Sequence, residues 1–91
     1  MRKCASAIPF VDRHAQREQV VGSLGEPSSE HSASDLAWLT RAFGEGSPKT
    51  AALQANLRGA TALLLYSRSN SVMFVYLDGD KRAIKAECFL Q

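Results

Sequence analysis

The chain has 91 residues, of which 45% are hydrophobic and 22% charged, and its formal net charge is +2. This length predicts one domain with a single modest core, and the composition is that of an ordinary globular protein. The small net charge excludes a general demand for a polyanionic partner. No apolar run approaches the ~18 residues of a membrane-spanning helix, so no membrane partner is expected.

The two cysteines, Cys4 and Cys88, lie near opposite ends of the chain. They form no C-x-x-C pair and are too few for a disulfide framework, which favours a reduced, cytoplasmic protein. The first residues also lack the apolar segment of a signal peptide. We expect Cys88 to pack as a small buried hydrophobic side chain.

The N-terminal part of the chain predicts an edge strand, a helix and a loop. Residues 8–11 are apolar and suit a short edge strand, where Pro9 is tolerated. From Asp12, an acceptable N-cap, the composition becomes helical as far as Gly25. Residues 26–34 are polar and predict a loop.

The best-marked helix is expected over residues 33–43. Ser32 and Asp35 have the spacing of a capping box, in which a hydroxyl and a carboxylate each accept from a backbone N–H. Gly44 is a natural residue to follow the helix end. The apolar side of this helix consists of Leu36, Leu39 and Phe43.

A third helix is expected over residues 48–58. Ser47 can cap it, and Pro48 suits the first helical position because the N–H that it lacks would have no helical partner there. Leu53 and Leu57 lie one turn apart and Gly59 ends the helix.

The last third of the chain predicts an antiparallel β-meander over about residues 61–90. Residues 62–66 and 72–77 are apolar on both faces, which is typical of central strands with something packed on each side. Short polar connections between the runs suit hairpins. The third strand alternates, with Ile84, Ala86, Cys88 and Leu90 on one face and Lys85 and Glu87 on the other.

The expected fold class is therefore α+β. Two or three N-terminal helices, over about residues 12–58, pack on a three-stranded antiparallel meander that an edge strand at residues 8–11 extends. All of this forms a single domain, residues 1–91. The expected core consists of Leu36, Leu39, Phe43, Leu53, Leu57, Leu63, Leu65, Phe74, Tyr76, Ile84 and Cys88.

No motif predicts catalysis, a cofactor or a metal. Zinc sites almost always contain at least one close pair of ligands, whereas Cys4, His14, His31 and Cys88 are far apart in the sequence. The serines cluster where loops and caps are expected, and nothing in the sequence connects them to a histidine that could act as their base.

A winged helix-turn-helix that binds DNA is one functional alternative. Residues 33–43 and 48–58 would be its helix pair and residues 66–72 its wing. The second helix offers few basic groups, chiefly Lys49 and Arg58. Nucleic acid is therefore a weakly supported partner.

Beyond residue 38 the chain has a helix, a Gly/Pro break, a Leu-Arg-Gly step, a Leu-rich strand, a strand ending in an aromatic residue, an Asp-Gly turn and a strand ending on Phe. These features are residues 39–43, 46–48, 57–59, 62–66, 72–76, 78–80 and 84–89. Their order resembles that of the RelE/ParE superfamily of bacterial toxins, the HigB-like members especially. The resemblance implies a small α+β fold in which helices precede an antiparallel meander.

The chain departs from the ribonuclease members of that superfamily. Leu64 and Tyr66 stand where those members have Glu and Arg, and Val72 and Met73 lie near the position of a further Arg. Residues 90–91 replace their basic ending. The resemblance therefore implies a non-nucleolytic member that acts by binding another protein, as ParE-like members do, and RNA cleavage is not expected.

The expected contact surface is a basic cluster of Arg68, Lys81, Arg82 and Lys85, with Arg58 as a further binding residue. Ordinary solvated charges at hairpin ends would give the same pattern. The expected partner is an antitoxin-like or other cellular protein. A homodimer of unassigned role is the other alternative, because thin helices leave part of an apolar sheet for a second subunit.

Overall fold

The structure is a computed structural model that describes the backbone of residues 2–90 and the side chains of residues 7–89. Within these limits it has four α-helices, two 3₁₀ turns and four strands. In chain order they are α1 Arg2–Asp12, α2 Arg17–Leu24, β1 Ser29–Ser32, the turn Ala33–Asp35, α3 Leu36–Phe43, α4 Pro48–Asn56, the turn Leu57–Gly59, β2 Ala62–Ser67, β3 Ser71–Leu77 and β4 Ala83–Leu90. The predicted α+β class and the antiparallel meander are confirmed.

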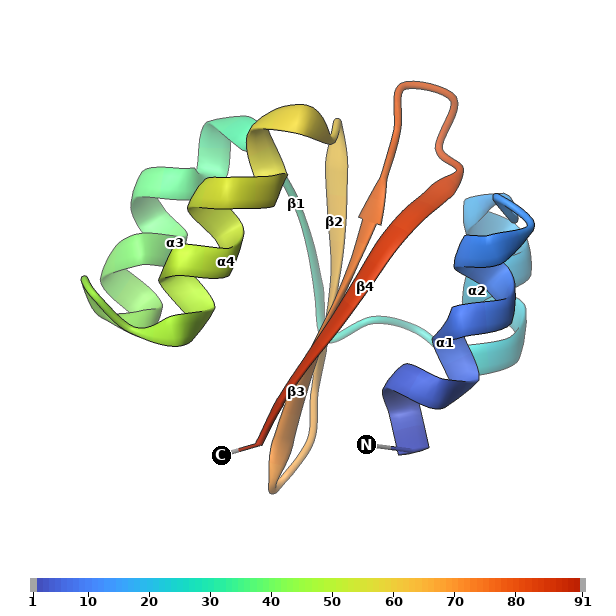
Figure 1. Cartoon of the computed structure of the whole chain (residues 1–91), viewed down its shortest axis with the longest axis horizontal. Coiled ribbons are helices and arrows are strands. Elements are labelled where there is room, and N and C mark those ends of the chain that lie inside the picture. Colours follow the sequence, from blue (N-terminus) through green and yellow to red (C-terminus); the bar gives the residue numbers. More distant parts are fainter. Residues whose placement is uncertain (1, 91) are drawn as a thin grey trace.

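The strands form one antiparallel sheet in the order β1-β2-β3-β4. Helices α1 and α2 cover one face of the sheet, and α3 and α4 cover the other (Figure 1). Both faces of β2 and β3 are apolar because successive side chains of a strand point to opposite faces, and helices cover each face of this sheet. None of the described helices is long and apolar enough to cross a membrane.

Each layer has its own core. The α1/α2 side buries Phe10, Ala15, Val20, Leu64, Tyr66, Met73, Val75, Leu77 and Ala83 among others. The α3/α4 side buries Leu39, Leu53, Leu57, Leu63, Leu65, Val72, Phe74 and Tyr76, with Leu36, Phe43, Ile84 and Phe89 partly buried against them. Every residue expected in the core belongs to one of these two clusters.

The expected edge strand at residues 8–11 is wrong, because these residues belong to α1. Ala7 and Phe10 are buried and Val11 is partly buried on the same side, which is the i, i+3, i+4 spacing of a helix. Pro9 lies inside the helix with its ring exposed, so the helix tolerates it on the solvent side at the loss of one hydrogen bond.

The helix expected from Asp12 begins only at Arg17. Between the two helices the chain turns at His14, whose φ is 50°, and Ala15 bonds to the sheet: its carbonyl accepts from the N–H of Ala83 at 2.9 Å. The predicted end of the helix is confirmed at Gly25, whose φ of 92° suits glycine.

The polar segment expected as a loop contains strand β1. Ser29–Ser32 pairs antiparallel with β2, and His31 lies opposite Leu63. Backbone hydrogen bonds hold a strand regardless of its side chains, and a strand at the sheet edge can be polar. The sheet therefore has an extra edge strand, as expected, but residues 29–32 form it and not residues 8–11.

The helix expected over residues 33–43 starts as the 3₁₀ turn Ala33–Asp35 and becomes α3 only at Leu36, whereas α4 begins at Pro48 as predicted. The N–H of Ser32 donates to Asp35 Oδ2 at 3.2 Å, and the carboxylate thereby anchors the turn that leads into α3. At α4, Ser47 Oγ accepts from the N–H of Thr50 at 3.2 Å, and Pro48 occupies the first turn.

Strand β4 contains a β-bulge. Tyr76 pairs with Lys85 while Leu77 pairs with Ala83, so Ile84 is the extra residue and the alternation reverses there. The expectation that Ile84, Ala86 and Cys88 share a face is therefore wrong, because Ile84 joins the α3/α4 core and the other two join the α1/α2 core.

Cys88 is partly buried and is disulfide-bonded. Its expected packing against apolar neighbours is confirmed, but the expectation that the cysteines of this protein are reduced is wrong for Cys88. Structural disulfides are rare in the reducing cytoplasm, so this bond weakens the argument for a cytoplasmic location, which stays a prediction.

Candidate functional site at β1 and α3

The structure does not gather the basic residues expected to form one contact surface. Arg68 lies in the β2–β3 connection, whereas Lys81 and Arg82 lie in the β3–β4 connection at the other end of the sheet (Figure 1). Arg58 lies in the turn after α4. The fifth residue, Lys85, is on β4.

The basic groups near the β3–β4 connection also face different layers. Lys85 Nζ donates to Asn56 Oδ1 of α4 at 3.1 Å. The Arg82 guanidinium donates to the carbonyl of His14, on the α1/α2 side, at 3.3 Å. These contacts suit solvated charges that fasten local turns better than a shared binding surface.

Instead, the structure brings together Ser29, His31, Asp35 and Trp38. Ser29 and His31 point to the α3/α4 side of β1, because residues two apart in a strand share a face. The 3₁₀ turn after β1 returns Asp35 to the imidazole, and the first turn of α3 presents Trp38. Sequence reasoning missed this cluster because it took the segment for a loop.

Hydrogen bonds link three of these side chains in a line. Ser29 Oγ lies 2.8 Å from His31 Nε2, and His31 Nδ1 lies 3.3 Å from Asp35 Oδ2. An ionised carboxylate only accepts hydrogen bonds, so Nδ1 must carry the proton that bonds to Asp35. In the neutral imidazole Nε2 then accepts from the Ser29 hydroxyl.

Trp38 lies against the histidine of this line. Its ring stacks on the imidazole with 5.7 Å between ring centroids and 24° between planes. The tryptophan is nevertheless 57% exposed, whereas the His31 side chain is only 12% exposed. With Arg41 and Ala42 it lines a shallow depression on the outer side of α3.

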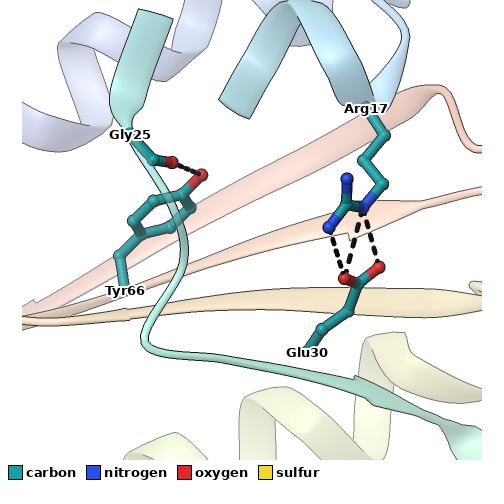
Figure 2. Close-up of polar contacts among 4 residues, drawn as sticks. All are labelled: Arg17, Gly25, Glu30 and Tyr66. Carbon is teal, nitrogen blue, oxygen red and sulfur yellow. Dashed lines mark hydrogen bonds and ion pairs between the residues drawn. The ribbon is translucent and has the colours of Figure 1, made fainter. Parts of the chain in front are cut away.

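The opposite side of β1 is fastened to α2. Glu30 accepts three hydrogen bonds from the Arg17 guanidinium, the shortest being 2.7 Å, as Figure 2 shows. The bonds to Arg17 lower the pKa of the Glu30 carboxyl and raise that of the guanidinium. This pair fixes β1, and thereby the side chains that point the other way.

A second tie lies beside the first. The Tyr66 hydroxyl donates to the carbonyl of Gly25, at the end of α2, at 2.9 Å (Figure 2). Burial raises the pKa of this phenol, so it stays a donor across the ordinary pH range. The segment that leads from α2 into β1 is thus held at both ends.

The described residues contain no group of three or more His, Cys, Asp or Glu side chains that could hold a metal ion. Comparison of the chain with protein-family models, curated proteins and solved structures finds no match in any of the three. Any function must therefore be argued from this chain's own residues.

Proposed function

We propose that the protein is a small protein-interaction module and that the outer side of α3 is its contact surface. The observation that carries this proposal is the exposure of Trp38, 57%, together with its rigid seat on His31. Tryptophan and arginine are the side chains most enriched where binding energy concentrates, and a side chain already held in place loses little entropy on binding. Trp38 is enriched in this sense and already held in place, and Arg41 adds a second side chain of the enriched type.

The chemistry of the surface selects the partner. Trp38 offers a flat apolar face, and Arg41 lies three residues further along the helix, on the same side. A guanidinium fits a carboxylate with two parallel hydrogen bonds. The partner is therefore a protein segment that presents an apolar side chain beside an acidic one.

We also propose the toxin-like role that the sequence resemblance implies, in its non-nucleolytic form. Support comes from the order of elements, since a helix, a Gly/Pro break, a helix end and three meander strands follow one another over residues 36–90. Further support comes from Leu64 and Tyr66, at the positions of the ribonuclease Glu and Arg. Both are buried in the α1/α2 core, which favours the non-nucleolytic form.

The winged-helix alternative finds no support in this geometry. The hairpin that would be the wing consists of β2 and β3, the central strands, whose residues are buried on both faces. Helix α4 uses Leu53 and the adjoining Leu57 to pack on the sheet, and Lys49 near its start is half-buried. One exposed arginine, Arg58, is a thin basis for phosphate contacts.

The test is affinity capture of tagged protein from its native lysate, treated with nuclease, with the variants Trp38→Ala and Arg41→Ala. Ile8→Ala is the matched control, because Ile8 is the other exposed large hydrophobic residue of the described chain, 52% exposed on α1. A partner retained by wild type and Ile8→Ala but lost with Trp38→Ala is expected. Equal capture by all variants would refute this surface.

Binding can also be followed directly, because Trp38 is the only tryptophan of the chain. Its emission should shift to the blue when a purified partner covers it. Light scattering of the protein alone separates the homodimer alternative: a dimer that Trp38→Ala dissociates would make the partner a second copy.

A further inference from the structure

The line of Ser29, His31 and Asp35 has the arrangement of an activated serine nucleophile. We propose that Ser29 attacks the acyl carbon of small esters with His31 as its general base. This activity rests on the hydrogen bonds of Ser29, His31 and Asp35, whereas its substrate preference would share Trp38 and Arg41 with the interaction surface proposed above.

The geometry meets the two conditions that a serine nucleophile needs. The base lies within hydrogen-bond reach, with Ser29 Oγ 2.8 Å from Nε2, and a third group orients the base, with Asp35 at 3.3 Å from Nδ1. Such sites are recognised by these roles and not by the order of the residues in the chain.

The histidine in the middle of this line is mostly buried, whereas the residues at its two ends, Ser29 and Asp35, are partly accessible. The His31 side chain is 12% exposed and lies beneath Trp38, whereas the Asp35 side chain is 43% exposed. Ser29 is half-buried and keeps part of its surface in solvent. The carboxylate is itself held, because the same Oδ2 atom also accepts from the N–H of Ser32 at 3.2 Å.

The reaction balances with water as the only co-reactant. Ser29 Oγ forms a bond to the acyl carbon, and its proton passes to His31 Nε2 while Asp35 stabilises the imidazolium that results. The alkoxide or phenoxide of the ester leaves with that proton. Water, deprotonated by His31, then releases the acid and restores the Ser29 hydroxyl.

The depression that Trp38, Arg41 and Ala42 line on α3 indicates the class of ester, because Trp38 also contacts the histidine of the Ser29–His31–Asp35 line. Trp38 connects the two, since its ring stacks on the imidazole and also lines the depression with Arg41. A flat apolar group would lie against the indole, and a negative charge on it would meet the guanidinium. Small aromatic esters that carry a carboxylate fit this description.

The first experiment treats the intact protein with an alkyl fluorophosphonate and identifies the modified residue by peptide mass spectrometry. In this reaction Oγ replaces fluoride on phosphorus, and the proton leaves through His31. We expect one adduct on Ser29, with a labelling rate that falls by about 100-fold or more in His31→Gln. No adduct on Ser29, or labelling that does not depend on His31, would overturn the proposal.

Two substitutions serve as matched controls for the serine and the histidine. Ser34→Ala removes an exposed hydroxyl that bonds to Ser32 Oγ at 2.7 Å and not to the imidazole, and His14→Gln removes the other histidine. Neither should change the labelling rate. Hydrolysis of p-nitrophenyl acetate by wild type, Ser29→Ala and both controls then measures turnover, and only Ser29→Ala should lose it.

Asp35→Asn separates the charge of Asp35 from its structural role. One amide oxygen can still accept from both Ser32 and His31, so the helix start should survive while the negative charge beside the imidazolium is lost. We expect slower labelling of Ser29 at an unchanged melting temperature. Partner capture should persist in Ser29→Ala, so failure of either proposal can be told from failure of the other.

Discussion

The two layers that cover the sheet are attached by different means. The α3/α4 side is filled by large side chains, with Phe74 at the centre: its ring centroid lies 5.8 Å from that of Phe43, 6.4 Å from Tyr76 and 5.4 Å from Phe89. On the α1/α2 side the sheet supplies large residues such as Tyr66 and Met73, whereas the buried residues of the helical segment, apart from Phe10, are small: Ala7, Ala15 and Val20. The helices of this side are fastened at defined points by polar contacts.

Those contacts include backbone bonds as well as side-chain ties. The N–H of Arg17 donates to the carbonyl of Lys81 at 2.9 Å, in addition to the Arg17–Glu30 pair and the Tyr66–Gly25 bond. Large buried side chains thus attach α3 and α4, whereas α2 is attached largely by hydrogen bonds at its ends, in addition to buried Val20. The two sides should respond differently to the same kind of substitution.

The largest effect is expected from Phe74→Ala. Loss of a fully buried ring leaves a cavity, and such substitutions cost about 3–5 kcal/mol, a large share of the about 5–15 kcal/mol that stabilises a domain. Met73→Ala, its neighbour on the other face, should cost less because methionine is smaller and more flexible than phenylalanine, so its removal leaves a smaller cavity that relaxes more easily. Urea unfolding measures both, and a larger loss for Met73→Ala would contradict the comparison.

Alkaline unfolding should expose the next difference. Burial, and then the hydrogen bond and charge of Glu87, raise the pKa of Tyr76 well above its ordinary value of about 10. Because the folded pKa is raised, the stability from the neutral phenol is complete below about pH 10 and is lost as the pH rises beyond it. The slope is about 1.4 kcal/mol per pH unit for one such group.

The measurement is the free energy of unfolding between pH 9 and pH 11 for wild type and Tyr76→Phe. The free energy of unfolding of Tyr76→Phe should fall with rising pH less steeply than that of wild type, by about 1.4 kcal/mol per pH unit. Equal slopes would mean that the phenol ionises in the folded protein as readily as in the unfolded chain.

Deleting the hydroxyl of Tyr66 tests a polar tie directly. Tyr66→Phe leaves the Gly25 carbonyl without the 2.9 Å bond, which should cost about 1 kcal/mol. Tyr76→Phe at neutral pH is the comparison on the other face: its bond to the Ala52 carbonyl is long, 3.5 Å, so any larger loss would have to come from the interaction of its hydroxyl with Glu87. Thermal unfolding of both variants decides the order.

The sequence allowed α3, α4 and the three-stranded meander to be predicted, because caps and apolar periodicity mark them. It did not allow β1, since a polar edge strand has no apolar pattern and depends on β2 for its hydrogen bonds. Pro9 concealed α1, and the bulge at Ile84 reverses an alternation that reads as regular. The hydrogen-bonded line of Ser29, His31 and Asp35 could not be predicted for the same reason, because Ser29 and His31 share a face only if their segment is a strand.

The ion pair between α2 and β1 should contribute less. Glu30→Gln removes the charge-assisted bonds from Arg17, but solvent reaches both side chains, so we expect a loss of about 0.5–1 kcal/mol that shrinks in high salt. Because Arg17 lowers the pKa of Glu30, this contribution is present above the unfolded pKa of about 4.3 and disappears as the pH falls below it.

Glu18→Gln is the control for that pair, since Glu18 is exposed on the same helix. A double-mutant cycle with Arg17→Gln isolates the coupling between Arg17 and Glu30. A coupling near zero would mean that α2 is held by its backbone bonds, the Tyr66–Gly25 bond and buried Val20, and that the Arg17–Glu30 pair contributes nothing to its attachment.

The smallest effect on stability is expected at the most conspicuous side chain. Trp38 lies outside both cores, so Trp38→Ala should change the free energy of unfolding by about 0.5 kcal/mol or less, as for most surface positions. Chemical denaturation followed by circular dichroism measures this without the tryptophan signal. A large aromatic side chain that is exposed and adds nothing to folding is best explained by contact with another molecule, whereas a loss near that of Phe74→Ala would return Trp38 to the α3/α4 core.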